Sequence, residues 1–236
     1  MVDLLSTKEE TQWFYEQRAA VVIKNLARQN INAQFVPGRA EALSVIMAMI
    51  PPGAVVARGD SLSCDQVGVL QALRDRRQNS ILDSFETDSE GYFSADPAAR
   101  HKMQKEAFLA DIFITGTNAV TLDGKLVNID GRGNRVAAMI FGPDKVIVVV
   151  GGNKIVKDEN EALLRVRQYA APLNAKRHAL KHHQEGFKDL PCVRTGTCVD
   201  CSHGYRICHY TVIISGAMDW QKGRLNVVII GETLGI

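Results

Sequence analysis

Four cysteines gather near the C-terminal end of this sequence, and their spacing suits a metal site. Cys192, Cys198, Cys201 and Cys208 all lie within residues 192–208. Cys198 and Cys201 are separated by two residues, and such a short turn can aim both sulfurs at one metal ion or one cluster. The outer two cysteines would complete a set of four thiolates. We therefore expect a metal centre at this place in the chain.

The spacing does not decide which metal these cysteines hold. Zinc and a 4Fe-4S iron-sulfur cluster both accept four thiolates. The run lacks the closely repeated short gaps of bacterial ferredoxins, and His203 or His209 could replace one cysteine in a zinc (Zn) site. Three alternatives therefore stay open: an iron-sulfur cluster, zinc, and free or redox-active thiols. The fifth cysteine, Cys64, stands alone in a helical pattern, and we expect it to be a small core residue.

Three polar loops follow apolar runs that are expected to be strands. In open α/β sheets the carboxyl ends of the strands form the ligand crevice, because loop amides and helix N-termini converge there. Glycine lets backbone amides approach an anion, arginine pairs with a carboxylate or phosphate, and aspartate orients hydroxyls or moves protons. The expected ligand is a small anionic metabolite. The candidate binding residues are Arg58, Gly59, Asp60, Ser61, Gly116, Thr117, Asn118, Asp130, Gly131, Asn134 and Arg135.

These loops do not identify a reaction. Gly, Asn and Asp are also ordinary turn residues, so any one of the loops could be purely structural. The glycines do not match the dinucleotide fingerprint, because Val136 stands where Gly131-Arg132-Gly133 would need a third glycine. The sequence also has no Walker loop for phosphate binding.

Two histidines further along the chain share a helical spacing. His178 and His182 are four residues apart, which places both rings on one side of a helix, as in a metal-binding pair. Basic residues surround them, and the neighbouring sequence supplies no acidic partner. We therefore expect a solvated helix face here rather than a metal site.

Alternating strands and helices are expected to position these residues. A first helix should begin at the capping box Ser6-Thr7-Lys8-Glu9. Strand-sized apolar runs occupy residues 54–57, 81–84, 111–115, 145–150 and 225–230, and helical patterns occupy 40–49, 64–76, 97–109 and 158–171. This alternation is typical of right-handed crossovers and a parallel sheet. The predicted fold class is α/β, with a parallel-rich sheet flanked by helices.

One hairpin is predicted within this alternation. Asp123-Gly124 lies between the β-patterned runs 119–122 and 125–129. An Asp-Gly pair in this position favours a tight turn in which both residues take positive φ.

Length and composition favour one large domain with a short tail. The chain has 236 residues and 46% hydrophobic content, which is enough to bury a full core. We expect an α/β domain over residues 1–185. A cysteine-containing segment over residues 186–236 should pack on this domain or complete it.

Charge and hydropathy disfavour several partners. Lysine and arginine total 28 against 26 acidic residues, without a basic stripe that would attract nucleic acid. The apolar runs fall short of the roughly 20 residues that a membrane-spanning helix needs. The start of the chain lacks the basic-then-apolar order of a signal peptide, so a cytoplasmic location is expected.

A stretch in the middle of the chain carries a family resemblance. Residues 115–136, TGTNAVTLDGKLVNIDGRGNRV, resemble the signature of the lactate-utilisation (LUD) domain family, in particular its lactate utilisation protein C group. Gly142-Pro143 and the following run to Gly151-Gly152-Asn153-Lys154 continue the similarity. The cysteine-rich C-terminal extension distinguishes the chain from shorter LUD proteins.

The resemblance has implications for fold and function. It implies a core like that of ribose-5-phosphate isomerase, glucosamine-phosphate deaminase and CoA transferases. It also implies a part in L-lactate utilisation beside iron-sulfur oxidoreductase partner proteins, which favours an iron-sulfur cluster over zinc. No catalytic residue of the related sugar-phosphate enzymes can be transferred to this chain, so the resemblance carries fold and pathway but not chemistry.

Three functional hypotheses follow. The first is a LUD protein that binds a small anionic metabolite and a cysteine-ligated iron-sulfur or metal centre, as an electron-transfer or accessory component. The second is an enzyme acting on a phosphorylated or CoA-linked substrate, with a structural zinc. The third is a non-catalytic subunit of an oxidation complex. Each is compatible with a homo-oligomer.

Overall fold

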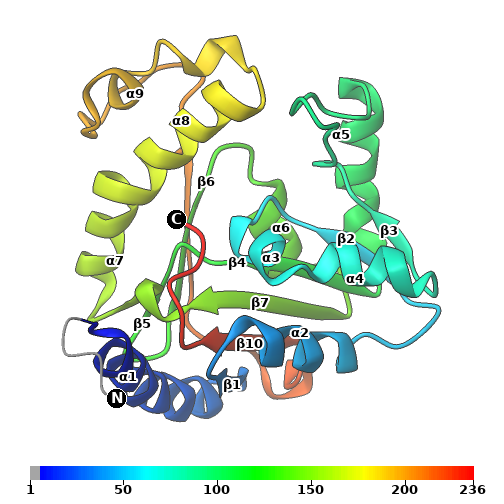
Figure 1. Ribbon diagram of the computed structural model, residues 1–236, viewed down its shortest axis with the longest axis vertical. Coiled ribbons are helices and arrows are strands. Elements are labelled where there is room, and N and C mark those ends of the chain that lie inside the picture. The colour runs from blue at the N-terminus through cyan, green and yellow to red at the C-terminus, as the bar shows by residue number, and fades with distance from the viewer. Residues whose placement is uncertain (1–5) are drawn as a thin grey trace.

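The computed structural model describes residues 6–236. The first five residues, on which part of the expectation of no signal peptide rests, lie outside this range. The described residues form two sheets with helices around them, and Figure 1 shows a helical layer standing apart from the main sheet. Across this range, no helix combines the length and apolar character needed to cross a membrane.

A six-stranded sheet passes through the middle of the molecule. Its strand order is β1, β10, β7, β4, β2, β3, and every neighbouring pair is parallel. The strands are β1 (Asn32–Val36), β10 (Leu225–Ile230), β7 (Lys145–Gly151), β4 (Ile112–Gly116), β2 (Val55–Arg58) and β3 (Ser80–Leu82). The central strands are buried on both faces, which explains why their sequences are continuous apolar runs. The predicted α/β class with a parallel sheet is confirmed.

Helices cover both faces of this sheet. The first core contains side chains of α1 (Lys8–Arg28) and α6 (Asn134–Ile140). The second contains side chains of α2 (Arg39–Ala48), α3 (Leu62–Val67) and α4 (Val69–Arg76). Strand β7 serves both cores, because successive side chains of a strand point to opposite faces: Val146 and Val148 lie in the first core, and Ile147 and Val149 lie in the second.

A second sheet holds the predicted hairpin. Its order is β8 (Ile155–Val156), β5 (Ala119–Thr121), β6 (Leu126–Asp130) and β9 (Tyr210–Ile214). Strands β5 and β6 pair antiparallel across Asp123-Gly124, as expected. Only Gly124 takes positive φ, at 90°, so the expectation that both turn residues would do so is wrong. The amide of Gly124 closes the turn by donating to the Thr121 carbonyl.

Residues beyond 185 supply strands to both sheets. Strand β10 lies between β1 and β7 in the main sheet, and β9 forms the edge of the second sheet beside β6. The cysteine-containing segment lies between the helical layer and β9, and it includes the short helix α9 (Pro191–Thr195).

Three helical segments follow one another without a break and form the helical layer. It consists of α7 (Glu159–Arg165), a π-helical turn (Val166–Ala170) and α8 (Ala171–Lys181). The expected helix end at residue 171 is wrong, because the helical layer continues through Pro172. The wider π-helical turn lies directly before this proline, where a regular α-helix would be disrupted by the missing N–H and the ring.

The remaining helical elements are short. They are α5 (Pro97–Glu106), which Asp96 caps through the Ala98 and Ala99 amides, and turns at Ala107–Leu109, Gly152–Lys154, Glu185–Phe187 and Asp219–Gln221. The capping box predicted at Ser6 does not form. Helix α1 starts one residue later, so Ser6 accepts from the amide of Lys8.

Candidate functional site

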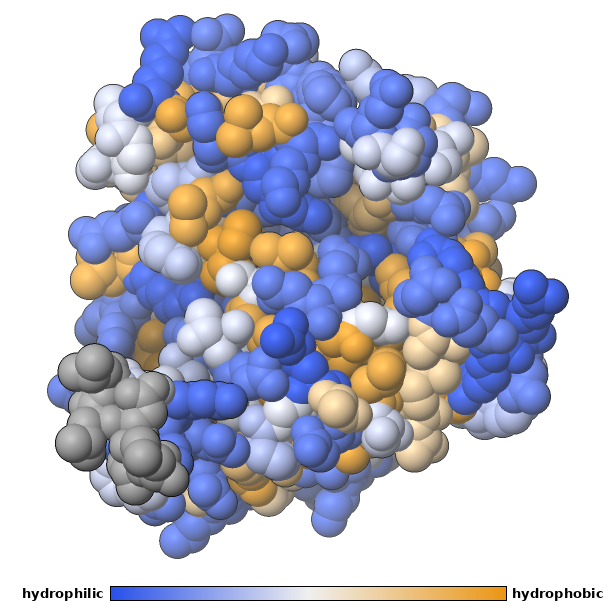
Figure 2. Space-filling view, viewed as in Figure 1, coloured by the Kyte–Doolittle hydropathy of each residue, from blue (hydrophilic) through white to orange (hydrophobic). Residues whose placement is uncertain are grey.

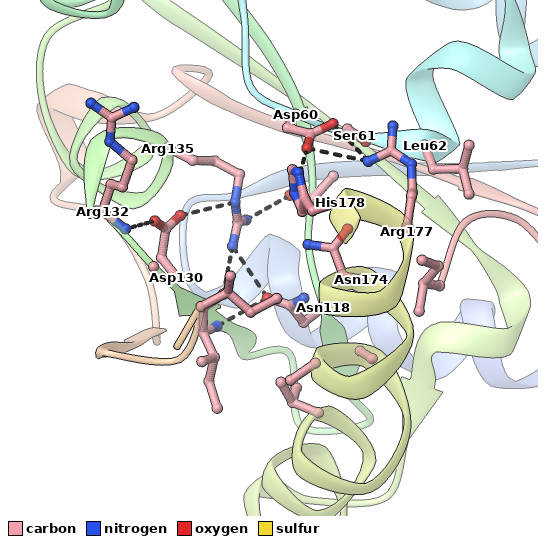
Figure 3. Close-up of a pocket in the computed structure, with 18 of the residues that line it drawn as sticks. Asp60, Ser61, Leu62, Asn118, Asp130, Arg132, Arg135, Asn174, Arg177 and His178 are labelled. Carbon is pink, nitrogen blue, oxygen red and sulfur yellow. Dashed lines mark hydrogen bonds and ion pairs between the residues drawn. The ribbon is translucent and has the colours of Figure 1, made fainter. Parts of the chain in front are cut away.

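The predicted polar loops converge on one cavity. It has a volume of about 250 Å³ and lies at the carboxyl ends of β2, β4 and β6, with α8 along one side (Figure 3). In the space-filling view, hydrophilic residues cover most of this face of the molecule, and apolar residues are visible in its middle (Figure 2). The predicted residues that line the cavity are Asp60, Ser61, Gly116, Thr117, Asn118, Asp130, Gly131, Asn134 and Arg135.

Two predicted residues, Arg58 and Gly59, do not line this cavity. Arg58 is 8% exposed and forms ion pairs with Asp65, at 2.9 Å, and Asp83, at 3.8 Å. Burial opposes its charge, but these carboxylates outweigh burial and raise the pKa of Arg58. The guanidinium at the end of β2 therefore belongs to an internal ion-pair network and not to the cavity wall.

The loops after β2 and β4 touch each other directly. A Cβ added to Gly116 would lie 2.7 Å from Ser61 Oγ, closer than real Cβ contacts. A Cβ here would force the Ser61 side chain to move, so the close approach of the two loops favours glycine. Ser61 in turn accepts a hydrogen bond from the Cys64 amide, which caps α3 and fixes the loop after β2.

Arg135 ties the other loops together. Its Nη1 donates to Asn128 Oδ1 at 2.7 Å, its Nη2 donates to Asn118 Oδ1 at 3.2 Å, and its Nε lies 3.2 Å from Asp130 Oδ2. Further bonds reach the carbonyls of Gly116 and Ile129. Burial lowers the pKa of Arg135 in spite of Asp130. Because protein acceptors occupy this guanidinium so fully, its main effect is to shape the cavity.

Asp60 anchors α8 to the end of β2. Its carboxylate accepts from Arg177 Nη1 at 3.2 Å and lies 3.3 Å from His178 Nε2 (Figure 3). Burial alone would raise the pKa of Asp60, but the hydrogen bond from His178 and the charge of Arg177 hold the pKa well below its usual range. Asp60 is therefore ionised in the folded protein.

The prediction of a solvated face at His178 is wrong. The His178 side chain is 13% exposed, and its ring packs against His182 and Phe187. Its acidic partner, Asp60, comes from the loop after β2, far away in the sequence, so a local search could not find it. The other ring nitrogen, Nδ1, is buried without a hydrogen-bond partner among the described atoms.

Lys154 is a cavity residue that the sequence analysis did not single out. It follows β7 in a tight turn and is 5% exposed. Its Nζ donates to Ser63 Oγ at 2.9 Å, and within residues 6–236 no carboxylate forms an ion pair with it. Burial, reinforced by the charges of Arg165 and Arg135, lowers the pKa of Lys154 to about 7. A lone lysine directly after the longest apolar strand was the signal that could have found it.

The cavity wall carries more positive than negative charge. Five basic residues line it, namely Arg100, Arg132, Arg135, Lys154 and Arg177, together with the two carboxylates of Asp60 and Asp130. Each carboxylate is already engaged by an arginine. The Arg100 guanidinium stacks over the Phe93 ring at 3.3 Å and donates through Nε to the Ser84 carbonyl. Such a wall favours an anionic ligand.

The four predicted cysteine ligands line a second, much smaller pocket. Cys192, Cys198, Cys201 and Cys208 surround about 20 Å³ beside Pro172. Burial raises the pKa of Cys192 and Cys208, and nearby thiols add to this effect. His203 and His209 do not line this pocket. Across the described chain no three His, Cys, Asp or Glu side chains are arranged as metal ligands. The four thiols thus share one small pocket.

The cysteine pocket and the cavity have a common wall. Ala171 and Ile207 line both. Ile207 also packs on the third predicted loop, since a Cβ added to Gly131 would lie 3.1 Å from its Cα. The cysteine-containing segment therefore closes one side of the cavity. Cys64 lies elsewhere, fully buried in the second core as expected, where burial raises its pKa to about 11.

Fold and site together define a class of protein: an α/β protein with a positively charged cavity at the carboxyl ends of its parallel strands. The family model of the LUD domain matches residues 19–230, so the chain belongs to the LUD domain family, which is linked to lactate utilisation. The match extends over most of the C-terminal segment, β10 included.

Two solved structures show a more distant similarity to this chain. A DUF162 family protein from Deinococcus radiodurans is 17% identical, with a TM-score of 0.45, and the match covers 95% of this chain and 98% of that chain. For eIF2B beta from Chaetomium thermophilum the identity is 15% and the TM-score 0.34, with 52% of this chain and 44% of that chain covered. None of the curated proteins matches this sequence.

Proposed function

We propose that this LUD protein takes part in the utilisation of L-lactate or a related 2-hydroxy acid in the cytoplasm, by binding a small anionic metabolite in the cavity beside Asp60. The excess of basic over acidic side chains on the cavity wall carries this proposal. Arg100 and Arg132 supply guanidinium groups that no carboxylate pairs with in the described part of the chain. Carboxylates and phosphates are the anions that arginine recognises best.

Size also supports a small ligand. Pockets for drug-sized molecules span about 300–1,000 Å³, whereas this cavity measures about 250 Å³. A three-carbon hydroxy acid or oxo acid fits such a space, and a complete CoA group would have to extend into solvent.

The second part of the proposal is a cysteine-ligated centre. Cys192, Cys198, Cys201 and Cys208 would hold an iron-sulfur cluster, or alternatively zinc, and the protein would serve as an electron-transfer or accessory component beside iron-sulfur oxidoreductase partners. Four thiols on one small pocket support this idea. An iron-sulfur cluster would supply one-electron transfer next to the metabolite cavity. Arg206, which lines the same pocket, would offset part of the thiolate charge.

Calorimetric titration of the full chain with L-lactate and pyruvate tests the metabolite site. We expect Arg132→Met to weaken binding by about tenfold or more, since a hydrogen bond to a charged group is worth ~1.5–3 kcal/mol. Lys102→Met is the matched control, because Lys102 is 78% exposed and lies outside the cavity. Equal affinities for both variants, or no binding of either acid by the wild type, would contradict the proposal.

Metal analysis after purification without oxygen tests the cysteine centre. Iron or zinc should be present in the wild type and lost in Cys198→Ser and Cys201→Ser, with an absorption band if the metal is an iron-sulfur cluster. Cys64→Ser is the control, because Cys64 lies in the second core and should leave the metal content unchanged. A colourless, metal-free wild type in which Cys192, Cys198, Cys201 and Cys208 all react with a thiol reagent would end this part of the proposal.

A second candidate is an enzyme that acts on a phosphorylated substrate. The same unpaired guanidiniums favour it, because a phosphate suits them as well as a carboxylate does. Titration with ribose 5-phosphate beside lactate separates the two candidates. Tight binding of the sugar phosphate, together with loss of its turnover in Asn118→Ala, would favour the enzyme.

A further inference from the structure

Among the described residues, Lys154 is the one lysine that lines the cavity, and its amine lies in an unusual environment. The side chain lies at the carboxyl end of β7, the strand between β10 and β4 in the main sheet. It is 5% exposed and lines the metabolite cavity. Its one hydrogen bond joins Nζ to Ser63 Oγ, and Ser63 itself is 1% exposed. A neutral hydroxyl thus takes the place that a carboxylate partner normally holds.

The neighbouring charges also oppose protonation of this amine. Arg165 and Arg135 both add repulsion to the cost of burying an ammonium group, while the buried Cys64 thiol has the opposite effect if it ionises. Arg165 donates to the Asn118 carbonyl at 2.8 Å, at the edge of the same cavity. Desolvation and neighbouring cations are the two conditions that make a lysine amine nucleophilic at neutral pH.

These conditions raise the fraction of neutral amine at pH 7 by a large factor. With a pKa of about 7 instead of 10.5, about half of the Lys154 side chains are neutral at pH 7. For an exposed lysine the neutral fraction at this pH is about a thousandfold smaller. Free amine is thus placed where an anionic metabolite would bind.

We propose that Lys154 forms an imine with the carbonyl carbon of a small 2-oxo acid held in the cavity. The proposal rests on the proposed metabolite site and adds its ligand class: a 2-oxo acid, the oxidised counterpart of a 2-hydroxy acid. Carboxylate recognition by the arginines on the wall would hold the acid end, and the ketone would face the amine.

The step balances without a further reactant. The Nζ lone pair forms the new C–N bond as the carbonyl π electrons move to oxygen, and that oxygen takes up a proton lost by the amine. The resulting carbinolamine then expels its hydroxyl group with a proton as water, which leaves a C=N bond. Ser63 is a positioning residue in this step, because its hydroxyl accepts from Nζ and fixes the amine.

Reductive trapping of the full-length protein tests the inference. The protein is incubated with pyruvate and cyanoborohydride at pH 7, and the modified residue is located by peptide mass analysis. We expect one reduced pyruvate on Lys154 and half-maximal trapping near pH 7. Excess L-lactate, which has no ketone group, should protect Lys154. Exposed lysines should be modified only at much higher pH.

Two variants complete the test. Lys154→Arg keeps the charge but has no amine that can form an imine, so trapping should vanish. Lys145→Arg is the control, because Lys145 begins β7, bonds the Met49 carbonyl and does not line the cavity. This variant should trap like the wild type. Circular dichroism of both variants checks their folding.

The outcomes separate this inference from the proposed function. Calorimetric binding of pyruvate without an adduct on Lys154, or adducts spread over exposed lysines, overturns the imine and leaves the metabolite site in place. No binding of lactate or pyruvate by the wild type, with no adduct, overturns both. An adduct confined to Lys154 supports both.

Discussion

The buried carboxylate of Asp60 provides the sharpest test of how the site is held together. Its side chain is 19% exposed, and it joins the end of β2 to α8 through Arg177 and His178. Asp60→Asn keeps the shape and one acceptor oxygen but removes the charge. Arg177, itself 15% exposed, would then be left without its carboxylate.

The expected loss of stability follows from this burial. Removing one partner of a buried ion pair costs ~3–5 kcal/mol, and the remaining exposure and the retained amide oxygen reduce this to ~2–4 kcal/mol. For a chain of this length such a loss lowers the melting temperature by roughly 4–16 °C. Chemical denaturation followed by circular dichroism measures the free energy of unfolding.

The pH dependence gives a second signature of the same group. The folded-state pKa of Asp60 lies below the value of ~3.9 in an unfolded chain, so its stabilisation is fully present above that unfolded value and is lost as the pH falls through the folded value. The stability difference between wild type and Asp60→Asn should therefore shrink as the pH falls below ~3.9 towards the folded value of Asp60.

An exposed ion pair of the same residue types serves as the control. Asp189 and Arg194 lie 2.7 Å apart, with side chains 70% and 65% exposed. Exposed pairs contribute about 0–1 kcal/mol, so Asp189→Asn should leave the unfolding free energy nearly unchanged. Equal destabilisation by the two variants, or a difference for Asp60→Asn that persists in strong acid, would refute the reasoning.

Three further predictions concern the turn, α8 and the cavity. Gly124→Ala should destabilise the protein by ~2–4 kcal/mol in denaturant melts, because φ is 90° and a Cβ would lie 3.0 Å from backbone atoms of Asn25 and Leu26. Gly53→Ala, with φ of 84° but open space around it, should cost only ~1–2 kcal/mol. Equal losses would contradict the steric argument. Burial lowers the pKa of His182 below its unfolded value of ~6.5. The histidine should therefore contribute its full stability above ~6.5 and lose this contribution as the pH falls through its folded value. Unfolding free energies measured from pH 8 to pH 5 that change equally in wild type and His182→Asn would rule this out. Arg135→Lys should lower the free energy of unfolding by ~2–4 kcal/mol and weaken lactate binding, since an ammonium cannot reach Asn118, Asn128 and Asp130 together. An unchanged melting curve would contradict this role.

Where the sequence has continuous apolar runs, it predicted the strands well. The run 225–230 was expected as a strand and is β10 with the same bounds. The apolar runs that begin at Ala54 and Lys145 became β2 and β7, and both lie in the parallel sheet. Continuous β-branched runs leave little choice, because only a strand covered on both faces can bury every side chain in so short a length.

The errors occurred where contacts or local geometry that periodicity does not encode changed the expected structure. Pro172 was expected to follow the end of a helix, but the π-helical turn before it lets the helix continue. Arg58 was placed among the ligand residues, whereas its guanidinium pairs with Asp65 and Asp83 and does not line the cavity. His178 was expected on a solvated face because its acidic partner is not local.

The candidate site was predicted in part for a physical reason. Loops at the carboxyl ends of parallel strands must lie along one edge of the sheet, so Asp60 and Gly116 could be placed together from the chain alone. The residues that α8 and the turn after β7 bring in, such as Arg177 and Lys154, could not. Their positions depend on how a helix packs across the strand ends, which periodicity does not specify.

The sequence by itself determined the α/β class, the hairpin at Asp123-Gly124 and the family, because each follows from local patterns of apolar runs, turn residues and a long signature. The tertiary structure alone decided the electrostatics of the cavity. It buried Lys154 without a carboxylate, and it gave Asp60 its partners from α8. Burial and charge pairing depend on distances between residues far apart in the chain, and these distances exist only once the sheet and α8 have packed together.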